Sequence, residues 1–326
     1  MNTFAIITSI NYPTLAVSQF SQKAEIKTIV VADNKTPTDW VAANTQLLSV
    51  SEQLSLGYQI TNYLPWNHYS RKNIGYIYAI KHGADIIYDT DDDNIPTEDW
   101  YIPDFSGRFS VLAENQSFIN IYQYFSEDKI WPRGFPLLLL RNDYQESFTN
   151  LVMQPAQIGI WQGLADSDPD VDAIYRMTIG SECFFKKKEP IVLGRGTVCP
   201  FNSQNTFFQK EAYPLLYIPS SVSFRFCDIL RGLVAQPILW AKGLKLGFTM
   251  ATVFQKRNPH NFMNDFKSEI SMYLNCEKVV STVAANIKSN YSVKENLVTA
   301  YESLAKLKVV KRRELDIVTA WVKSIE

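Results

Sequence analysis

The sequence predicts an α/β fold in which a mostly parallel, Rossmann-like central sheet is flanked by helices. In the N-terminal third, short β-rich apolar runs alternate with helical periodicity, and polar turns separate them. This alternation is typical of βαβ units with right-handed crossovers. Helical patterns return from about residue 228 and continue into the C-terminal region. We therefore expect an α/β domain over residues 1–264 and a helical appendage over residues 265–326.

The first elements follow one another without long connections. "FAIITSI" (4–10) and "KTIVVAD" (27–33) are buried-type strands, and a helical stretch lies between them. A second helix is expected around residues 74–81, where Gly83 suits a left-handed C-terminal cap. The strand "ADIIYD" (84–89) comes directly after it.

The remaining two thirds give a less regular pattern. Residues 100–225 are rich in aromatic residues, Pro and polar turns, so we expect loops and short strands that shape a substrate cleft. A helix should begin near the capping box Ser292-x-x-Glu295. The Lys311–Arg313 cluster of a last helix is either a solvated face or a contact to an anionic glycan or a membrane surface.

The net charge of the chain is close to zero, so the chain as a whole does not attract a partner of opposite charge. Lys and Arg number 32 against 33 Asp and Glu, which argues against nucleic-acid binding. We find neither a signal peptide nor an apolar run near the ~20 residues that span a bilayer. We therefore expect a cytoplasmic protein with peripheral membrane contact at most. Without CxxC spacing, the cysteines should be buried, reduced thiols: Cys183, Cys199, Cys227 and Cys276.

The segment "IIYDTDDDNIP" (86–96) places four carboxylates within five positions directly behind an apolar strand. These are Asp89, Asp91, Asp92 and Asp93. Like charges this close repel each other, so the folded chain needs a compensating cation. Ligands of an open parallel sheet bind beyond the carboxyl ends of its strands. Clustered carboxylates suit Mn²⁺ or Mg²⁺, which commonly complete their shells with substrate phosphates.

Three interpretations of this motif stay open, whereas an EF-hand is excluded. An EF-hand loop from Asp89 would need Gly at its sixth and Glu at its twelfth position, where the chain has Asn94 and Trp100. A phosphatase with an aspartyl nucleophile usually has Thr or Val where Asp93 stands. A solvated acidic turn would need no ligand. The third interpretation is the D-x-D metal site of nucleotide-sugar glycosyltransferases.

The motifs around the aspartates resemble those of GT-A glycosyltransferases. In residues 71–93 an Arg precedes Asn-x-Gly, a helix, a strand and the acidic motif. More narrowly, residues 55–96 resemble STELLO-type glycosyltransferases and, more distantly, reversibly glycosylated polypeptides, which include UDP-arabinopyranose mutases. Further matches are "VVADNKTP" (30–37), "WPRGFP" (131–136) and "PDVDAIYR" (169–176). The resemblance covers about residues 4–265 and leaves the C-terminal helices outside it.

The resemblance implies roles for residues at a nucleotide-sugar site. Asp33 would face the base or ribose of the donor, unless it caps a turn. Arg71 would meet the donor phosphates, unless it is a surface residue at a helix start. Asp91 and Asp93 would hold the metal. The neighbouring Asp89 and Asp92 would contact the ribose or support the metal shell.

The late segment "FQKRNPHNF" (254–262) implies a second set of donor contacts. His260 lies where GT-A enzymes place a histidine that completes the metal shell or touches the diphosphate. Lys256 and Arg257 could neutralise the charge of the leaving group. The alternative is a solvated loop. We expect His68 and His82 to be ordinary surface or helix residues.

Asp228 is the candidate catalytic base. Many GT-A enzymes have an acid at this point that deprotonates the acceptor hydroxyl, for which it must lie within hydrogen-bonding reach. Alternatively, Asp228 is a helix N-cap paired with Arg231. Asp170 and Asp172 are the next candidates for the base.

These observations predict a glycosyltransferase that uses Mn²⁺ or Mg²⁺ to move a hexosyl or pentosyl group. The donor is expected to be a UDP-sugar, and the acceptor is a hydroxyl of a glycan or another molecule. A UDP-sugar mutase or self-glycosylating protein is the alternative, because "RGFP" resembles the Arg-Gly-Tyr-Pro motif tied to self-glycosylation and would make Arg133 the modified residue. A non-catalytic protein that binds sugar nucleotides is the third hypothesis.

Overall fold

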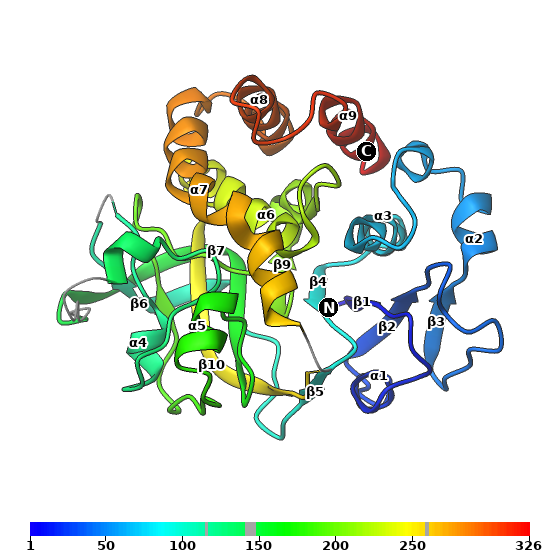
Figure 1. Cartoon of the computed structure of the whole chain (residues 1–326), viewed down its shortest axis with the longest axis horizontal. Coiled ribbons are helices and arrows are strands. Elements are labelled where there is room, and N and C mark those ends of the chain that lie inside the picture. Colours follow the sequence, from blue (N-terminus) through cyan, green and yellow to red (C-terminus); the bar gives the residue numbers. More distant parts are fainter. Residues whose placement is uncertain (115–116, 141–147, 258–260) are drawn as a thin grey trace.

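The computed structural model describes residues 1–114, 117–140, 148–257 and 261–326. Ten strands within these ranges form one mixed sheet with helices packed around it (Figure 1). The strands are β1 (Thr3–Thr8), β2 (Ile26–Val31), β3 (Thr45–Leu48), β4 (Ile86–Thr90), β5 (Asn94–Pro96), β6 (Ser106–Leu112), β7 (Leu151–Asp166), β8 (Ile191–Val192), β9 (Asn205–Gln209) and β10 (Lys245–Gln255). Their order is β3-β2-β1-β4-β9-β7-β6-β8-β10-β5.

The helices differ widely in length. The α-helices are α1 (Leu15–Phe20), α2 (Val50–Ser55), α3 (Lys72–Lys81), α4 (Tyr122–Phe125), α5 (Ala173–Thr178), α6 (Phe224–Ala241), α7 (Phe262–Asn286), α8 (Val293–Lys306) and α9 (Glu314–Ser324). Short 3₁₀ segments are η1 (Gln59–Asn62), η2 (Tyr69–Arg71), η3 (Leu137–Leu140) and η4 (Lys210–Leu216). No helix in these ranges combines the length and apolarity needed to cross a bilayer. All four cysteines are buried thiols, as predicted.

The N-terminal half of the sheet has the predicted βαβ arrangement. Strands β3, β2, β1 and β4 are parallel neighbours. Alternate side chains of β1 pack into two different apolar cores. Phe4 and Ile6 lie on one face of the sheet, and Ala5 and Ile7 lie on the other. The predicted helix α3 ends before Gly83, whose φ of +75° confirms the left-handed cap.

The second half of the sheet is mixed, so the prediction of a mostly parallel sheet holds only for the first four strands. The 16-residue strand β7 runs antiparallel to β6 and β9 and parallel to β10. We expected loops and short strands here because residues 100–225 are rich in aromatic residues, Pro and polar turns. At Pro155, β7 pairs with β6 but with no second strand. Because Pro155 has no N–H group to donate, it suits a position with a neighbouring strand on one side only.

The C-terminal helices share the main apolar core. The predicted boundary between residues 264 and 265 falls inside α7, whose buried side packs on α6. The ring of Trp321 on α9 lies 6.5 Å from that of Tyr76 on α3 and 6.0 Å from that of Tyr217. Figure 1 shows α7, α8 and α9 (orange to red) along one side of the molecule, next to α6 and α3. These helices therefore support α3, whose first residue is Lys72.

A glycine brings α3 close to the sheet. A Cβ on Gly75 would stand 2.6 Å from Cγ2 of Ile6 and 2.6 Å from Cγ2 of Val31.

Gly75→Ala should therefore destabilise the protein, because overpacking costs about 1–3 kcal/mol and the gain in helix propensity is at most about 1 kcal/mol. The free energy of unfolding in urea measures the change. Lys81→Ala, at an exposed position of the same helix, should stay within about 0.5 kcal/mol of the parent. Equal stability of both variants would contradict this close packing.

Candidate functional site

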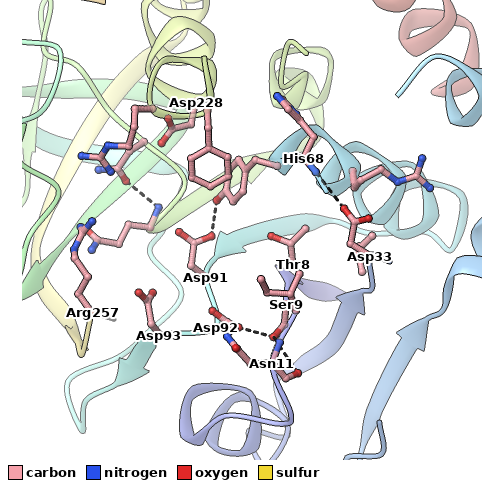
Figure 2. Close-up of a pocket in the computed structure, with 18 of the residues that line it drawn as sticks. Thr8, Ser9, Asn11, Asp33, His68, Asp91, Asp92, Asp93, Asp228 and Arg257 are labelled. Carbon is pink, nitrogen blue, oxygen red and sulfur yellow. Dashed lines mark hydrogen bonds between the residues drawn. The ribbon is translucent and has the colours of Figure 1, made fainter. Parts of the chain in front are cut away.

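A cavity of about 400 Å³ lies at the carboxyl ends of β1, β2 and β4 (Figure 2). The segments that follow these strands supply Ser9, Asp33 and the acidic residues 91–93. Asp228 reaches the cavity from α6, and Arg257 reaches it from the end of β10. The acidic segment therefore lies at the sheet edge where the sequence predicted it.

A buried lysine holds the acidic segment in place. Lys72, the first residue of α3, is completely buried. Its Nζ lies 2.7 Å from Asp89 Oδ1, 2.6 Å from the carbonyl oxygen of Thr90 and 3.0 Å from Asp91 Oδ1. One ammonium group thus contacts three consecutive residues, and the chain itself supplies part of the compensating positive charge.

Asp89 is locked between two cations. Its second oxygen, Oδ2, lies 2.7 Å from Nη1 of Arg231 on α6. Burial raises the pKa of Asp89, but Lys72 and Arg231 outweigh this effect and leave the pKa below its ordinary value. Asp89 has no exposed surface and does not line the cavity. Of its two predicted roles, the geometry fits support of the neighbouring carboxylates.

Asp91 faces the cavity with one oxygen. Its Oδ1 accepts hydrogen bonds from Lys72 Nζ and, at 2.5 Å, from the Tyr69 hydroxyl. Its Oδ2 has no hydrogen-bond partner among the described residues, and the side chain is 30% exposed. Burial raises the pKa of Asp91, and the nearby Asp93 raises it further against the effect of Lys72. Such a carboxylate favours an additional cation.

Asp92 and Asp93 form hydrogen bonds with different neighbours of the acidic segment. Asp93 Oδ2 accepts a hydrogen bond of 3.0 Å from Nε2 of Gln255, and burial raises the pKa of Asp93. Asp92 Oδ2 accepts hydrogen bonds from the Ser9 hydroxyl and, at 3.1 Å, from Asn11 Nδ2. Figure 2 shows Asp91 and Asp93 beside the same space, whereas Asp92 binds the segment after β1. No cluster of three or more His, Cys, Asp or Glu side chains suited to a metal ion occurs in the described ranges.

Asp33 lies at the end of β2, as predicted, and organises the wall around it. Its carboxylate accepts hydrogen bonds from the backbone N–H groups of Asn34, Asn67 and His68 at 2.7, 2.8 and 3.2 Å. The carboxylate lines the cavity while anchoring residues 67–68. Its contact with a base or ribose stays a prediction.

Arg71 is buried rather than a surface residue. Its Nε donates to Oε1 of Gln53 at 3.1 Å, and its guanidinium lies 3.6 Å from the ring centre of Trp66. Burial lowers the pKa of Arg71 to about 10. The side chain lines the cavity but is engaged with protein groups, so its contact with phosphates stays a prediction.

Asp228 is not a helix cap, which corrects the alternative that we considered. The N-cap of α6 is Ser223, and Asp228 lies within the helix. The predicted pair with Arg231 is also wrong, because Arg231 binds Asp89. Asp228 instead pairs with Arg133, whose Nη2 lies 2.8 Å from Oδ2. Arg133 comes from a distant loop, so no local pattern could have indicated it.

Arg133 connects two carboxylates at the cavity wall. Its Nε and Nη2 each donate to Asp170 at 2.8 Å, and Nη1 and Nη2 donate to Asp228 at 3.1 and 2.8 Å. Its Nη1 also donates to the carbonyl oxygen of Arg225. Burial raises the pKa of Asp170, but Arg133 outweighs it and brings the pKa to about 2. Both carboxylates and the guanidinium are buried and line the cavity.

Of the other residues considered in the sequence analysis, Lys256, His82 and Asp172 do not line this cavity. Lys256 is exposed and lines a neighbouring cavity. His260 lies outside the described residues. His82 stacks on Tyr78 at the end of α3, whereas His68 lines the cavity, which we did not expect. Asp172 is the N-cap of α5 and accepts from Tyr175 N at 2.8 Å.

The chain is similar to STELLO glycosyltransferases. A family model with that description matches residues 225–326. The Arabidopsis thaliana protein named "Probable glycosyltransferase STELLO1" is 26% identical over 341 residues, which cover 98% of this chain and 44% of the relative. "Probable glycosyltransferase STELLO2" is 26% identical over 316 residues, which cover 91% of this chain and 41% of the relative. The chain spans less than half the length of these curated relatives.

These matches confirm the resemblance to STELLO-type proteins and, at the level of the family, support a glycosyltransferase. The expectation that the C-terminal helices lie outside the resemblance is wrong, because the matched residues include α7, α8 and α9. Trp321 of α9 packs against Tyr76 of α3, and both residues belong to the main apolar core.

Removal of the buried ammonium should destabilise the protein strongly. Lys72→Met leaves Asp89 and Asp91 close together without their shared cation, and breaking a buried ion pair from one side costs about 3–5 kcal/mol. Urea unfolding measures the loss. Lys187→Met is the matched control: its ion pair with Asp99, 2.6 Å long, is exposed and should contribute far less. A comparable effect of both variants would show that Lys72 is not the organising cation.

Proposed function

We propose that this chain, which is similar to STELLO glycosyltransferases over nearly its whole length, is a metal-dependent glycosyltransferase of the GT-A type. It would move a sugar from a UDP-sugar to an acceptor hydroxyl. The observation that carries the proposal is the shared cavity: Asp91 and Asp93 face it from the carboxyl end of β4, and Asp228 faces it from α6. One cavity thus offers both cation ligands and a candidate base.

The two carboxylates fit a hard divalent cation. Oδ2 of Asp91 accepts no hydrogen bond from a described residue, and Asp93 lies beside Asp91. Mn²⁺ or Mg²⁺ commonly takes one or two protein carboxylates and completes its shell with water and substrate phosphates. His260 remains a further proposed ligand. When bound, the metal would stabilise the departing diphosphate as a Lewis acid.

The residues around the carboxylates would position the donor. Asp33 lies at the end of β2, where the base or ribose would bind, and Arg71 lines the same part of the cavity. Arg257 lies next to Asp93 in Figure 2 and lines both this cavity and its neighbour, so its positive charge would lie near the diphosphate. Asp89 would act indirectly, because Lys72 and Arg231 hold it away from the cavity.

Asp228 is the better candidate for the base than Asp170. A base must accept the proton of the acceptor hydroxyl as its oxygen attacks the sugar carbon. Arg133 binds Asp170 through two of its nitrogens and holds the pKa of Asp170 below its ordinary value, which makes Asp170 a poor proton acceptor. Arg133 orients Asp228 through both of its oxygens, each of which keeps a lone pair for the acceptor.

The contacts of Arg133 also bear on the self-glycosylation alternative. All three guanidinium nitrogens donate to Asp170, Asp228 or the Arg225 carbonyl, and the side chain is buried. A nitrogen engaged in this way is a poor attacking group. No observation favours the mutase hypothesis over transfer, whereas a non-catalytic binding protein would not need the base.

The first functional prediction is metal-dependent UDP binding. Calorimetry should show that EDTA weakens UDP binding at least about tenfold, or about 1.4 kcal/mol, and that Mn²⁺ or Mg²⁺ restores it. Asp91→Asn combined with Asp93→Asn should abolish this dependence, because amides are far weaker ligands for hard cations. Asp316→Asn, at an exposed position of α9, should behave like the parent. Equal UDP affinity with and without EDTA would refute the metal site.

A second functional prediction separates catalysis by Asp228 from its structural role. Asp228→Asn should lower turnover about 10²–10⁴-fold, since an amide cannot take the proton. Asp170→Asn is the matched control, because it weakens the other ion pair of Arg133. The two variants should lose similar stability in thermal melts, but Asp170→Asn should retain much more activity. Parallel losses of activity in both variants would make Asp228 a structural residue.

A further inference from the structure

A second cavity, of about 610 Å³, adjoins the first. The two share Gln255 and Arg257 in their walls. The segment 168–170 separates them: Asp168 lines the second cavity and Asp170 lines the first. A molecule in the second cavity would therefore lie beside the wall that carries Asp170, Arg133 and Asp228.

The second cavity contains two arginines that share one carboxylate. Arg176 of α5 contacts Asp168 Oδ1 through Nη1, and Nε of Arg257 lies 3.1 Å from Asp168 Oδ2. Both guanidinium groups are at least nine-tenths buried, so solvent screens their charges poorly. The Nε of Arg176 is buried without a hydrogen-bond acceptor among the described residues. Burial lowers the pKa of Arg257, and the charge of Arg176 lowers it further.

The charge balance of the described residues that line this cavity is also positive. Lys256 lines it with the two arginines, which makes three cations against Asp168 and Glu182. One oxygen of Glu182 accepts a hydrogen bond of 3.1 Å from the Ser167 hydroxyl. One positive charge is thus left over among these described residues, and an anionic group in the cavity would balance it.

Two exposed aromatic rings complete the cavity. Phe254 and Phe262 line it and are 37% and 38% exposed. The guanidinium of Arg176 lies 6.0 Å from the ring centre of Phe262. Aromatic walls with a few charged groups are typical of pockets for small molecules, and an aromatic ring offers a flat apolar surface to the C–H face of a sugar.

We propose that the second cavity is the acceptor subsite, and that it binds a sugar carrying an acidic group, either a carboxylate or a phosphate. The acidic group would meet Arg176 and Arg257, while the ring would lie against the phenylalanines. A hydroxyl of this sugar would then point across the shared wall toward Asp228. The identification as an acceptor site rests on the proposed transferase function, whereas the preference for an acidic sugar rests on the cavity alone.

The test compares three sugars that share one ring and differ only at C6. These are D-glucuronate, D-glucose 6-phosphate and D-glucose. Each is titrated into the whole chain by ligand-observed NMR, with and without UDP and Mg²⁺. The two acidic sugars should bind at least about tenfold more tightly than glucose, which is the effect of one good charge-assisted contact. Their relative affinities distinguish a carboxylate site from a phosphate site.

Variants show whether the sugars bind in the second cavity and whether UDP binding is independent of it. Arg176→Gln should weaken the acidic sugars about tenfold and leave UDP affinity unchanged, whereas the exposed Arg312→Gln should change neither. Phe262→Ala should weaken all three sugars alike, and it provides the test if Arg176→Gln does not fold. Melting temperatures confirm that each variant is folded.

Several results would overturn this inference. Glucose binding as tightly as the acidic sugars would remove the charge preference. Arg176→Gln weakening UDP as much as the sugars would assign the arginines to the donor. Failure of all three sugars to bind, while UDP binds with metal, would refute the subsite and leave the proposed transferase intact. Sugar binding without any UDP binding would instead support the cavity and contradict the transferase.

Discussion

The buried ammonium of Lys72 is the contact on which the cavity depends. It joins the start of α3 to three consecutive residues at the end of β4, from Asp89 to Asp91, and Arg231 joins Asp89 to α6. Two cations thus balance Asp89 and Asp91, and a buried charge without such a partner would cost several kcal/mol. Because Lys72 and Arg231 already balance these two charges, the proposed metal would bind through the remaining oxygen of Asp91 and the adjacent Asp93.

Helix α6 couples this cation network to the opposite wall. Arg231 reaches toward β4, and Asp228, three residues earlier, reaches toward Arg133 and the loop of Asp170. Residues at this spacing lie on neighbouring positions of one helix face. A small rotation of α6 would therefore disturb both networks together. In the proposed transferase, this coupling would keep both sets of groups in position while charge develops on the leaving group.

Local patterns predicted the parts of the structure that local forces determine. The first strands, helix α3, the cap at Gly83 and the position of the acidic segment follow from periodicity and turn chemistry. Local patterns could not predict long-range contacts, such as the one between Arg133 and Asp228, which lie 95 positions apart. They also did not predict the full length of β7, which contains Pro155. Ser223, a good N-cap residue directly before the apolar run, was a visible signal that Asp228 is not the cap.

The position of Trp321 has a consequence for biosynthesis. Its ring lies against Tyr76 of α3, one turn beyond Lys72, and its indole N–H donates to the carbonyl oxygen of Pro214 at 2.9 Å. More than 240 residues separate the two rings along the chain. A nascent polypeptide that has not yet released α9 from the ribosome therefore lacks part of the core beneath α3. Maturation of the cavity has to wait for that release, and until then chaperones would meet an incompletely covered apolar surface.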